Sequence, residues 1–275
     1  MQTIAEQLFF VTIRAETQVR TGTAFLYQYV HDSDSAVAEK RGLFVVTNAH
    51  MLYESEWIRL TFHRGEDGLP VLGKRHVIQL PVTSWYIDDH ENVDIAVLPL
   101  SAFAAEADAE SQKYFIKAVT HEVQSSSAAL EVLDAIEDVV FIGYPNDFYD
   151  RVYNLPIARR GVTASPIAHD FEDAEAFVIS APVFPGSSGS PVFIVNSTEF
   201  RTRSGNLVQR PRTLFLGILS EFRYREAGGW FEFGGQSSKD VSVAFQESID
   251  IGIVRRESVI RKTIRSYLGS VGVAL

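Results

Sequence analysis

Residues 185–191 read Pro185-Gly186-Ser187-Ser188-Gly189-Ser190-Pro191 and lead directly into an apolar stretch, Val192 to Val195. Glycine has no Cβ, so Gly186 and Gly189 let the chain turn tightly around Ser188 and aim backbone N–H groups at one point. Such donors stabilise a developing oxyanion by about 3–4 kcal/mol each. Neither Ser187 nor Ser190 has glycine both two residues before it and one after it, so Ser188 is the predicted nucleophile.

Two earlier segments supply the groups that would activate this serine. The apolar run Leu43 to Val46 leads into Thr47-Asn48-Ala49-His50, and Asp94 stands before the apolar run 95–98. A serine hydroxyl is a poor nucleophile until a base takes its proton, and histidine suits that role because its unperturbed pKa is about 6.5. A carboxylate holds the imidazole in the right tautomer and stabilises the imidazolium. We therefore predict a catalytic triad of His50, Asp94 and Ser188.

The order of these residues along the chain excludes one rival. An α/β-hydrolase also carries a glycine-framed serine, but its triad runs Ser, Asp, His, whereas here the order is His, Asp, Ser. The remaining sequence agrees, because short runs rich in valine, isoleucine, phenylalanine and tyrosine recur between turn residues, which predicts many strands and few helices. These runs are Leu8 to Ile13, Ala24 to Val30, Leu43 to Val46, Trp57 to Phe62, Val77 to Val82, Val93 to Leu98, Val139 to Ile142, Phe177 to Ile179, Val192 to Val195, Leu214 to Leu219 and Val241 to Phe245. The pattern favours a sandwich or a barrel.

Five segments depart from this strand pattern. Ser101 to Glu131 is rich in alanine, serine and glutamate and is predicted to be a partly helical connector. Glu247 to Leu268 carries apolar residues at roughly helical spacing, which predicts a C-terminal helix with one buried stripe. The polar segments His31 to Gly42, Ser197 to Arg212 and Arg225 to Asp240 are predicted to be loops.

Together the three motifs resemble the chymotrypsin-fold (trypsin-like) serine peptidases, especially the bacterial group related to the Deg-type high-temperature-requirement proteases. Asp94 to Leu98 matches the D-I-A-V-L of that family, and 186–191 is similar to its G-D-S-G-G-P or G-N-S-G-G-P. Further similar segments are 22–25, 143–145 and 216–220, so the resemblance spans nearly the whole chain. It implies an all-β fold of two antiparallel six-stranded barrels with a C-terminal helix, divided at about residues 1–112 and 113–275. The first barrel would carry histidine and aspartate and the second serine.

The resemblance also implies roles around the triad. The backbone N–H groups of Gly186 and Ser188 would form the oxyanion hole, and an extended substrate would pair along Leu216 to Phe222. Two segments would bind the substrate side chain before the scissile bond: Pro182, Val183 and Phe184, and Ser220, Glu221 and Phe222. Val243 and Ala244 on the last strand would lie close by. No acidic residue stands at Pro182, where trypsin-like members have the aspartate that pairs with arginine or lysine. A weak preference for apolar side chains follows, unless Glu221 turns into the cleft.

Four positions in these motifs differ from the family or extend its pattern. Position 187 is serine, where secreted digestive members have the aspartate that receives a new amino terminus after zymogen cleavage. We therefore expect no activation by cleavage, and expect other contacts to hold the oxyanion loop. Ser220 resembles the serine that hydrogen-bonds the triad aspartate in the family. Asn48 and Ser190 are mild replacements.

Composition narrows the remaining classes. A formal net charge of −10 argues against a general nucleic-acid surface, which needs clustered lysine and arginine. The chain has no cysteine, which fits a reducing compartment, and with no leader pattern at Met1 we expect a bacterial, cytoplasmic protein. No apolar run suggests a membrane span, no cofactor or metal is expected, and 88–91 (DDHE) fits a solvated turn. The function predicted is a serine endopeptidase acting on proteins or peptides; the alternative is a trypsin-like module acting as a partner-regulated effector or a protein-binding scaffold.

Overall fold

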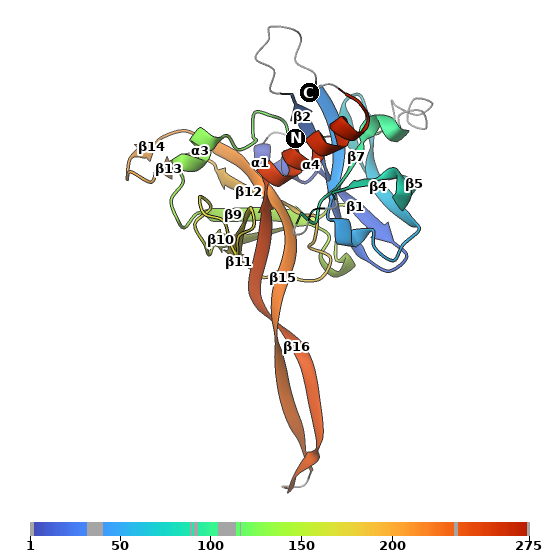
Figure 1. Cartoon of the computed structure of the whole chain (residues 1–275), viewed down its shortest axis with the longest axis vertical. Coiled ribbons are helices and arrows are strands. Elements are labelled where there is room, and N and C mark those ends of the chain that lie inside the picture. Colours follow the sequence, from blue (N-terminus) through green and yellow to red (C-terminus); the bar gives the residue numbers. More distant parts are fainter. Residues whose placement is uncertain are drawn as a thin grey trace.

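The computed structural model describes two β lobes with a helix lying across their junction and a long two-stranded arm projecting away from them (Figure 1). The described residues are 3–31, 41–88, 90, 93–103, 114–115, 117–233 and 236–273. Among them, no helix is long and apolar enough to cross a membrane.

The N-terminal lobe is an eight-stranded sheet in the order β5-β4-β1-β2-β3-β7-β6, with β8 paired to β4. Its elements are α1 (Ile4–Leu8), β1 (Thr12–Thr17), β2 (Thr21–Val30), β3 (Arg41–Thr47), η1 (Ala49–Met51), β4 (Trp57–Glu66), β5 (Leu69–Pro81), η2 (Val82–Ser84), β6 (Tyr86–Ile87), β7 (Ala96–Pro99), η3 (Leu100–Phe103) and β8 (Tyr114–Phe115). All of the pairings are antiparallel.

The C-terminal lobe is a closed six-stranded barrel in the order β10-β11-β16-β15-β12-β9. Its elements are α3 (Ser127–Glu131), β9 (Asp138–Gly143), η4 (Pro145–Asp147), β10 (Ile157–Thr163), β11 (Ala176–Ser180), β12 (Pro191–Asn196), β13 (Phe200–Arg201), β14 (Leu207–Val208), β15 (Arg212–Phe233), β16 (Gln236–Arg256) and α4 (Glu257–Ser270). The predicted all-β class with a closed six-stranded barrel and a C-terminal helix is therefore confirmed.

Three local predictions need correction. The C-terminal helix begins at Glu257 rather than Glu247, because residues 247–256 continue β16, and Ile251 to Arg255 pair with β11. The predicted loop Arg225 to Asp240 belongs instead to the arm made by β15 and β16, and Ser197 to Arg212 contains the short β13–β14 hairpin.

Two predicted segments lie partly outside the described residues. Of the predicted connector 101–131, the described parts include η3, β8 and α3, while residues 104–113 and 116 lie outside. Of the predicted loop at 31–42, residues 32–40 lie outside. The division at 112/113 therefore stays a prediction.

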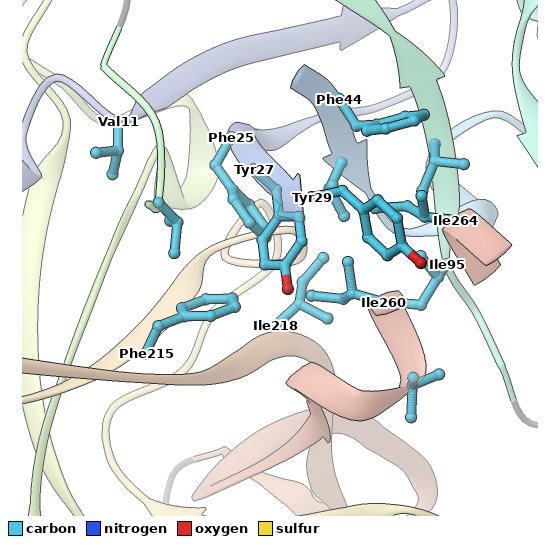
Figure 2. Packing of buried hydrophobic residues seen from close by; sticks show 14 of the residues in the cluster. Val11, Phe25, Tyr27, Tyr29, Phe44, Ile95, Phe215, Ile218, Ile260 and Ile264 are labelled. Carbon is cyan, nitrogen blue, oxygen red and sulfur yellow. The ribbon is translucent and has the colours of Figure 1, made fainter. Parts of the chain in front are cut away.

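A shared core joins the lobes beneath α4. Tyr27 from β2 and Phe215 from β15 pack with ring centroids 6.0 Å apart, and Ile260 of α4 lies against the same cluster (Figure 2). The buried Glu257 carboxylate at the start of α4 accepts hydrogen bonds from the Tyr27 hydroxyl (2.7 Å) and from the backbone N–H of Ser125 (2.7 Å). Burial raises the pKa of Glu257, and these donors oppose that rise. Because the contact is buried, it fixes α4 to both lobes.

His63 on β4 is buried. Its ring packs edge-on against Phe10 with the centroids 5.1 Å apart, and burial lowers its pKa from 6.5 to about 4. Between about pH 6.5 and pH 4, His63 is therefore protonated in the unfolded chain but neutral in the folded chain. As the pH falls through this window, the folded state loses stability.

We expect acidification from pH 7.5 to pH 4.5 to cost the wild-type protein about 2–3 kcal/mol through this residue alone. In His63→Phe the decline in unfolding free energy should be smaller by that amount, because no proton can bind. Urea denaturation at a series of pH values measures it. His121→Phe, at an exposed histidine, is the control and should follow the wild-type profile. Parallel profiles for wild type and His63→Phe would contradict the assignment.

Candidate active site

The nucleophile loop connects β11 to β12 and presents Ser188 between two glycines with positive φ. Gly186 has φ +84° and Gly189 has φ +85°, a region in which side chains are strained. A Cβ on Gly189 would lie 1.8 Å from the backbone oxygen of Thr23, so β2 approaches the loop too closely for any side chain. Gly189 is thus required by packing between the two lobes, and Gly186 by the close approach of Tyr144 and Asn146 within the C-terminal lobe.

The structure brings His50 and Asp94 into contact. His50 lies in η1 directly after β3, and its Nδ1 is 3.0 Å from Oδ2 and 3.1 Å from Oδ1 of Asp94. The backbone N–H of His50 also donates to Asp94 Oδ1 (3.0 Å). Asp94 has φ +44°, a conformation that is uncommon outside glycine and that these contacts hold in place. One carboxylate therefore orients both the ring and the backbone of His50.

Asn48 has a role that the sequence did not reveal. Its fully buried side-chain amide donates to the backbone oxygen of Asp94 (3.0 Å) and to Oγ of Ser220 (2.7 Å). Ser220 had been expected to bond the aspartate directly. Among the described contacts its hydroxyl instead reaches the aspartate segment through Asn48, and Asn48 is a structural bridge rather than a mild replacement.

The predicted oxyanion donors are the backbone N–H groups of Gly186 and Ser188, and their hydrogen-bonding state follows from the orientation of the loop. The backbone oxygen of Pro185 accepts a hydrogen bond from the N–H of Asn146 in η4 (2.6 Å). Carbonyl and N–H of a trans peptide point in opposite directions, so the Gly186 N–H is turned away from Asn146. Within the described part of the chain, the N–H groups of Gly186 and Ser188 have no acceptor. They can therefore bind an oxyanion without first breaking an internal bond.

Thr23, a buried residue of β2, helps to hold the nucleophile loop. Its N–H donates to the backbone oxygen of Ser188 (3.0 Å), and its hydroxyl donates to the backbone oxygen of Gly186 (3.5 Å). Ser187 is also buried, and its Oγ accepts the N–H of Phe184 (3.4 Å). These contacts hold the nucleophile loop with an uncharged residue at position 187.

Ser188 itself donates to the backbone oxygen of Ser220 on β15 (3.4 Å), its one described side-chain hydrogen bond. The edge of β15 before this point is occupied, because Ile218 pairs with β12 and the Leu219 N–H donates to the backbone oxygen of Ser190 (2.9 Å). The expected pairing of substrate along Leu216 to Phe222 is therefore corrected at its start: only Ser220 onward offers a free edge.

The two segments expected to bind the substrate side chain, Pro182 to Phe184 and Ser220 to Phe222, lie in different surroundings. Val183 is buried, whereas Pro182 is exposed, and its backbone oxygen accepts a hydrogen bond from Arg159 (2.9 Å). Glu221 pairs with the buried Arg255 (2.8 Å), so its charge is already neutralised. The guanidinium of Arg159 lies 4.6 Å from the ring centroid of Phe184 and adds a positive charge beside this segment. 

The expectation that Val243 and Ala244 lie near Ser220 is wrong. They pair with Gly229 and Gly228 in the arm, and the strand residue opposite Phe222 is Gly252. The reason is the length of the β15–β16 hairpin. The residues of the arm lie between the two strand segments that pair beside the nucleophile loop, so Val243 and Ala244 fall within the arm.

A cleft of about 360 Å³ opens beside Ser188 and His50. It is lined by Val19, Arg20, Thr21, His50, Met51, Asn146, Pro185, Gly186, Ser188 and Phe222. The Arg20 guanidinium donates to the backbone oxygens of His50 and Tyr53 (2.9 Å each), which braces the histidine segment. Arg20 is a second residue that the sequence did not single out.

The acidic turn at 88–91 shows one local contact. The Asp88 carboxylate is 2.6 Å from Nδ1 of the exposed His90, while residues 89 and 91 lie outside the described residues. Among the described residues, no group of three histidine, cysteine or acidic side chains is placed to hold a metal ion.

Two lobes, a closed barrel and a C-terminal helix define a chymotrypsin-like fold. The family model of the trypsin-like peptidase domain matches residues 22–199. The chain therefore belongs to the trypsin-like peptidase family. That match includes all three residues of the predicted triad.

Comparison with solved structures and curated sequences adds the following. A serine-to-alanine mutant of Rv3671c from M. tuberculosis, in an inactive form, is similar with 14% identity and a TM-score of 0.47, covering 98% of this chain and 92% of that one. A scabies mite inactivated protease paralogue, S-I1, is similar with 12% identity and a TM-score of 0.47, covering 98% of both chains. No curated protein matches the sequence significantly.

The contact between Gly189 and Thr23 gives a stability prediction. Gly189→Ala should lower the unfolding free energy by at least about 3 kcal/mol, because a Cβ would collide with the backbone of β2 and the loop must move. Urea denaturation measures the loss. Gly205→Ala is the matched control: its φ of +84° is close to the +85° of Gly189, but no atom lies within 4 Å of the added Cβ, so only the conformational cost of about 1 kcal/mol remains. Equal losses would refute the close approach.

Proposed function

We propose that this protein is a serine endopeptidase that cleaves peptide bonds through His50, Asp94 and Ser188. The observation that carries the proposal is the pairing of His50 Nδ1 with the Asp94 carboxylate (3.0 Å), across the cleft from a serine flanked by two unengaged backbone N–H groups. Membership of the trypsin-like peptidase family supports it. Orientation of the base and preorganised oxyanion donors are the two main requirements of acyl transfer.

The chemistry would proceed in two halves. Ser188 Oγ turns from the Ser220 carbonyl to His50 Nε2, gives up its proton and attacks the scissile carbonyl carbon. The resulting oxyanion accepts hydrogen bonds from the N–H groups of Gly186 and Ser188, while Asp94 stabilises the imidazolium. His50 then protonates the leaving amine, and a water molecule activated by His50 hydrolyses the acyl-enzyme.

Selectivity at the residue before the scissile bond would be weakly apolar. Glu221 is paired with Arg255, so it offers little to a basic side chain, and the nearby cation of Arg159 opposes one. An uncompensated charge is costly to bury, whereas apolar area gains about 25 cal/mol per Å². Phe222, which lines the cleft and packs against the cluster that contains the buried Val183, supplies apolar surface. This preference stays a prediction.

The role of Ser188 is tested by active-site labelling. Ser188→Ala should abolish both labelling by a fluorophosphonate probe and hydrolysis of peptides, because no other hydroxyl meets the donors and the base. Ser187→Ala and Ser190→Ala are the controls and should keep substantial activity. Undiminished labelling of Ser188→Ala would overturn the assignment.

The role of Asp94 is tested by removing its charge while keeping its shape. Asp94→Asn should lower turnover by roughly 10⁴-fold, since the amide stabilises the wrong imidazole tautomer and cannot balance the imidazolium. Steady-state kinetics on a peptide ester or amide measures the loss. The conservative Asp88→Asn, at a carboxylate paired with another histidine, should leave turnover within a few fold. A comparable loss in both variants would argue against a specific role.

Finer features of the proposal rest on the sequence alone. A relation to the Deg-type group, a bacterial origin and a cytoplasmic location are predictions, the last one supported by the lack of cysteine. The alternative function, a partner-regulated effector or a binding scaffold on the same fold, predicts that the purified chain is not labelled by the probe until a regulatory protein partner is added. Immediate labelling favours the endopeptidase.

A further inference from the structure

Strands β15 and β16 continue far beyond the barrel as a two-stranded arm (Figure 1). Inside the barrel each has a second neighbour: β15 pairs with β12 as far as Ile218, and β16 pairs with β11 from Ile251 to Arg255. Beyond these points they pair only with each other, out to Phe233 and Gln236. Each strand of the arm therefore has one edge with no strand beside it among the described residues.

The free edge of β15 begins at the active site. The N–H and the carbonyl of Leu219 are both taken by the nucleophile loop, through Ser190 and Gly189. The next carbonyl, that of Ser220, accepts the hydroxyl of Ser188 (3.4 Å). From there the unpaired edge runs without interruption to Phe233, roughly 45 Å at about 3.3 Å per residue. The catalytic serine and the arm thus share one continuous strand edge.

We propose that this edge binds the part of the substrate polypeptide that precedes the scissile bond, as an added antiparallel strand running toward the tip of the arm. The inference rests on the proposed function. His50 must protonate the leaving amine, so the residues after the scissile bond leave past His50, on the side of the cleft lined by Arg20 and Thr21. The residues before it leave along β15 from Ser220. In an antiparallel pair, residues farther upstream in the substrate meet residues farther along β15.

Two physical arguments favour a polypeptide strand as the occupant. A long unpaired strand edge invites pairing with another chain, and natural proteins normally shorten, cover or interrupt such edges. Here the residues from Arg223 to Glu226 are exposed and include no proline, and the register shift between Arg223 and Tyr224 places its extra residues, 249 and 250, on β16 rather than on β15. Tyr224 is 48% exposed and lies beside Phe222, with ring centroids 6.3 Å apart, so a strand laid here also covers apolar surface.

The substrate class follows from this mode of binding. Backbone hydrogen bonds supply the affinity, so many sequences are accepted, but about ten upstream residues must be free to extend. Unfolded or locally extended polypeptides meet this condition. A compact folded protein with a short exposed loop does not, because its backbone groups are already paired.

Binding to the inactive Ser188→Ala protein tests the inference without relying on hydrolysis. Two fluorescent peptides share the same residues around the scissile bond but carry either four or twelve residues before it. We expect the longer peptide to bind at least tenfold more tightly by fluorescence anisotropy. An arm-shortened variant, in which an Asn-Gly turn replaces residues 226–246 and closes the Arg225–Glu247 pair (2.7 Å), should lose this gain and bind the short peptide unchanged.

Methylated peptides test the strand geometry without altering the protein. A single N-methyl group placed at successive upstream positions of the longer peptide should weaken binding at every second residue only, because alternate N–H groups face the arm. Equal affinity of the two peptides, retention of the gain after shortening, or a uniform effect of methylation would each overturn the proposal. A dimer that dissociates on shortening while peptide affinity stays unchanged would assign the edge to a second copy of this chain.

Hydrolysis of the short peptide by the otherwise wild-type protein, with and without the shortened arm, tests the proposed function separately. We expect the two proteins to cleave it at similar rates. A chain that binds the longer peptide through the arm but cleaves neither peptide would contradict the endopeptidase assignment and leave the arm inference standing.

Discussion

The backbone of Thr23 is the point at which the two lobes are held in register. Its N–H binds the carbonyl of Ser188 (3.0 Å), its carbonyl accepts the hydroxyl of Thr47 (2.8 Å), and its own hydroxyl accepts the N–H of Tyr144 (3.0 Å). These bonds are buried, so breaking one leaves an unsatisfied polar group at a cost of about 1–3 kcal/mol. Because Thr47 ends the strand that leads to His50, contacts of this one residue hold both the His50 segment and the Ser188 loop.

Hydrogen bonds to the backbone and side chains hold the groups of the candidate site in fixed positions. Asp94 is kept in a left-handed conformation while its carboxylate accepts two donors from His50 and its carbonyl accepts Asn48. The peptide after Pro185 is kept in one orientation by Asn146. Groups held in this way need no reorganisation when an oxyanion develops, which is where preorganised sites gain most of their advantage. The arm adds a different property, since it binds by backbone and selects for an extended chain.

The sequence predicted the fold class and the residues of the candidate site because both leave local patterns. Apolar runs mark the strands, and glycines around Ser188 mark a tight turn. Most of the arm was missed because Arg225 to Asp240 is rich in glycine and polar residues and has no sustained alternation of apolar and polar residues, so it resembled a loop. The start of α4 was misplaced because Ile251 and Val254 fit a helical stripe as well as a strand, and only the pairing with β11 separates them. Asn48 acts on a distant chain segment, which no local pattern reports.

The bonds that assemble the site join residues far apart in the chain. Thr23 reaches Gly186 across 163 residues, and the Tyr27 hydroxyl reaches Glu257 across 230. A ribosome releases the N-terminal sheet first, with its base and carboxylate, long before the nucleophile loop and α4 emerge. A nascent chain therefore holds no complete site while much of it is still unfolded and easily cut. In a chain with the proposed peptidase activity, this separation in sequence would delay assembly of the site until most of the polypeptide has been made.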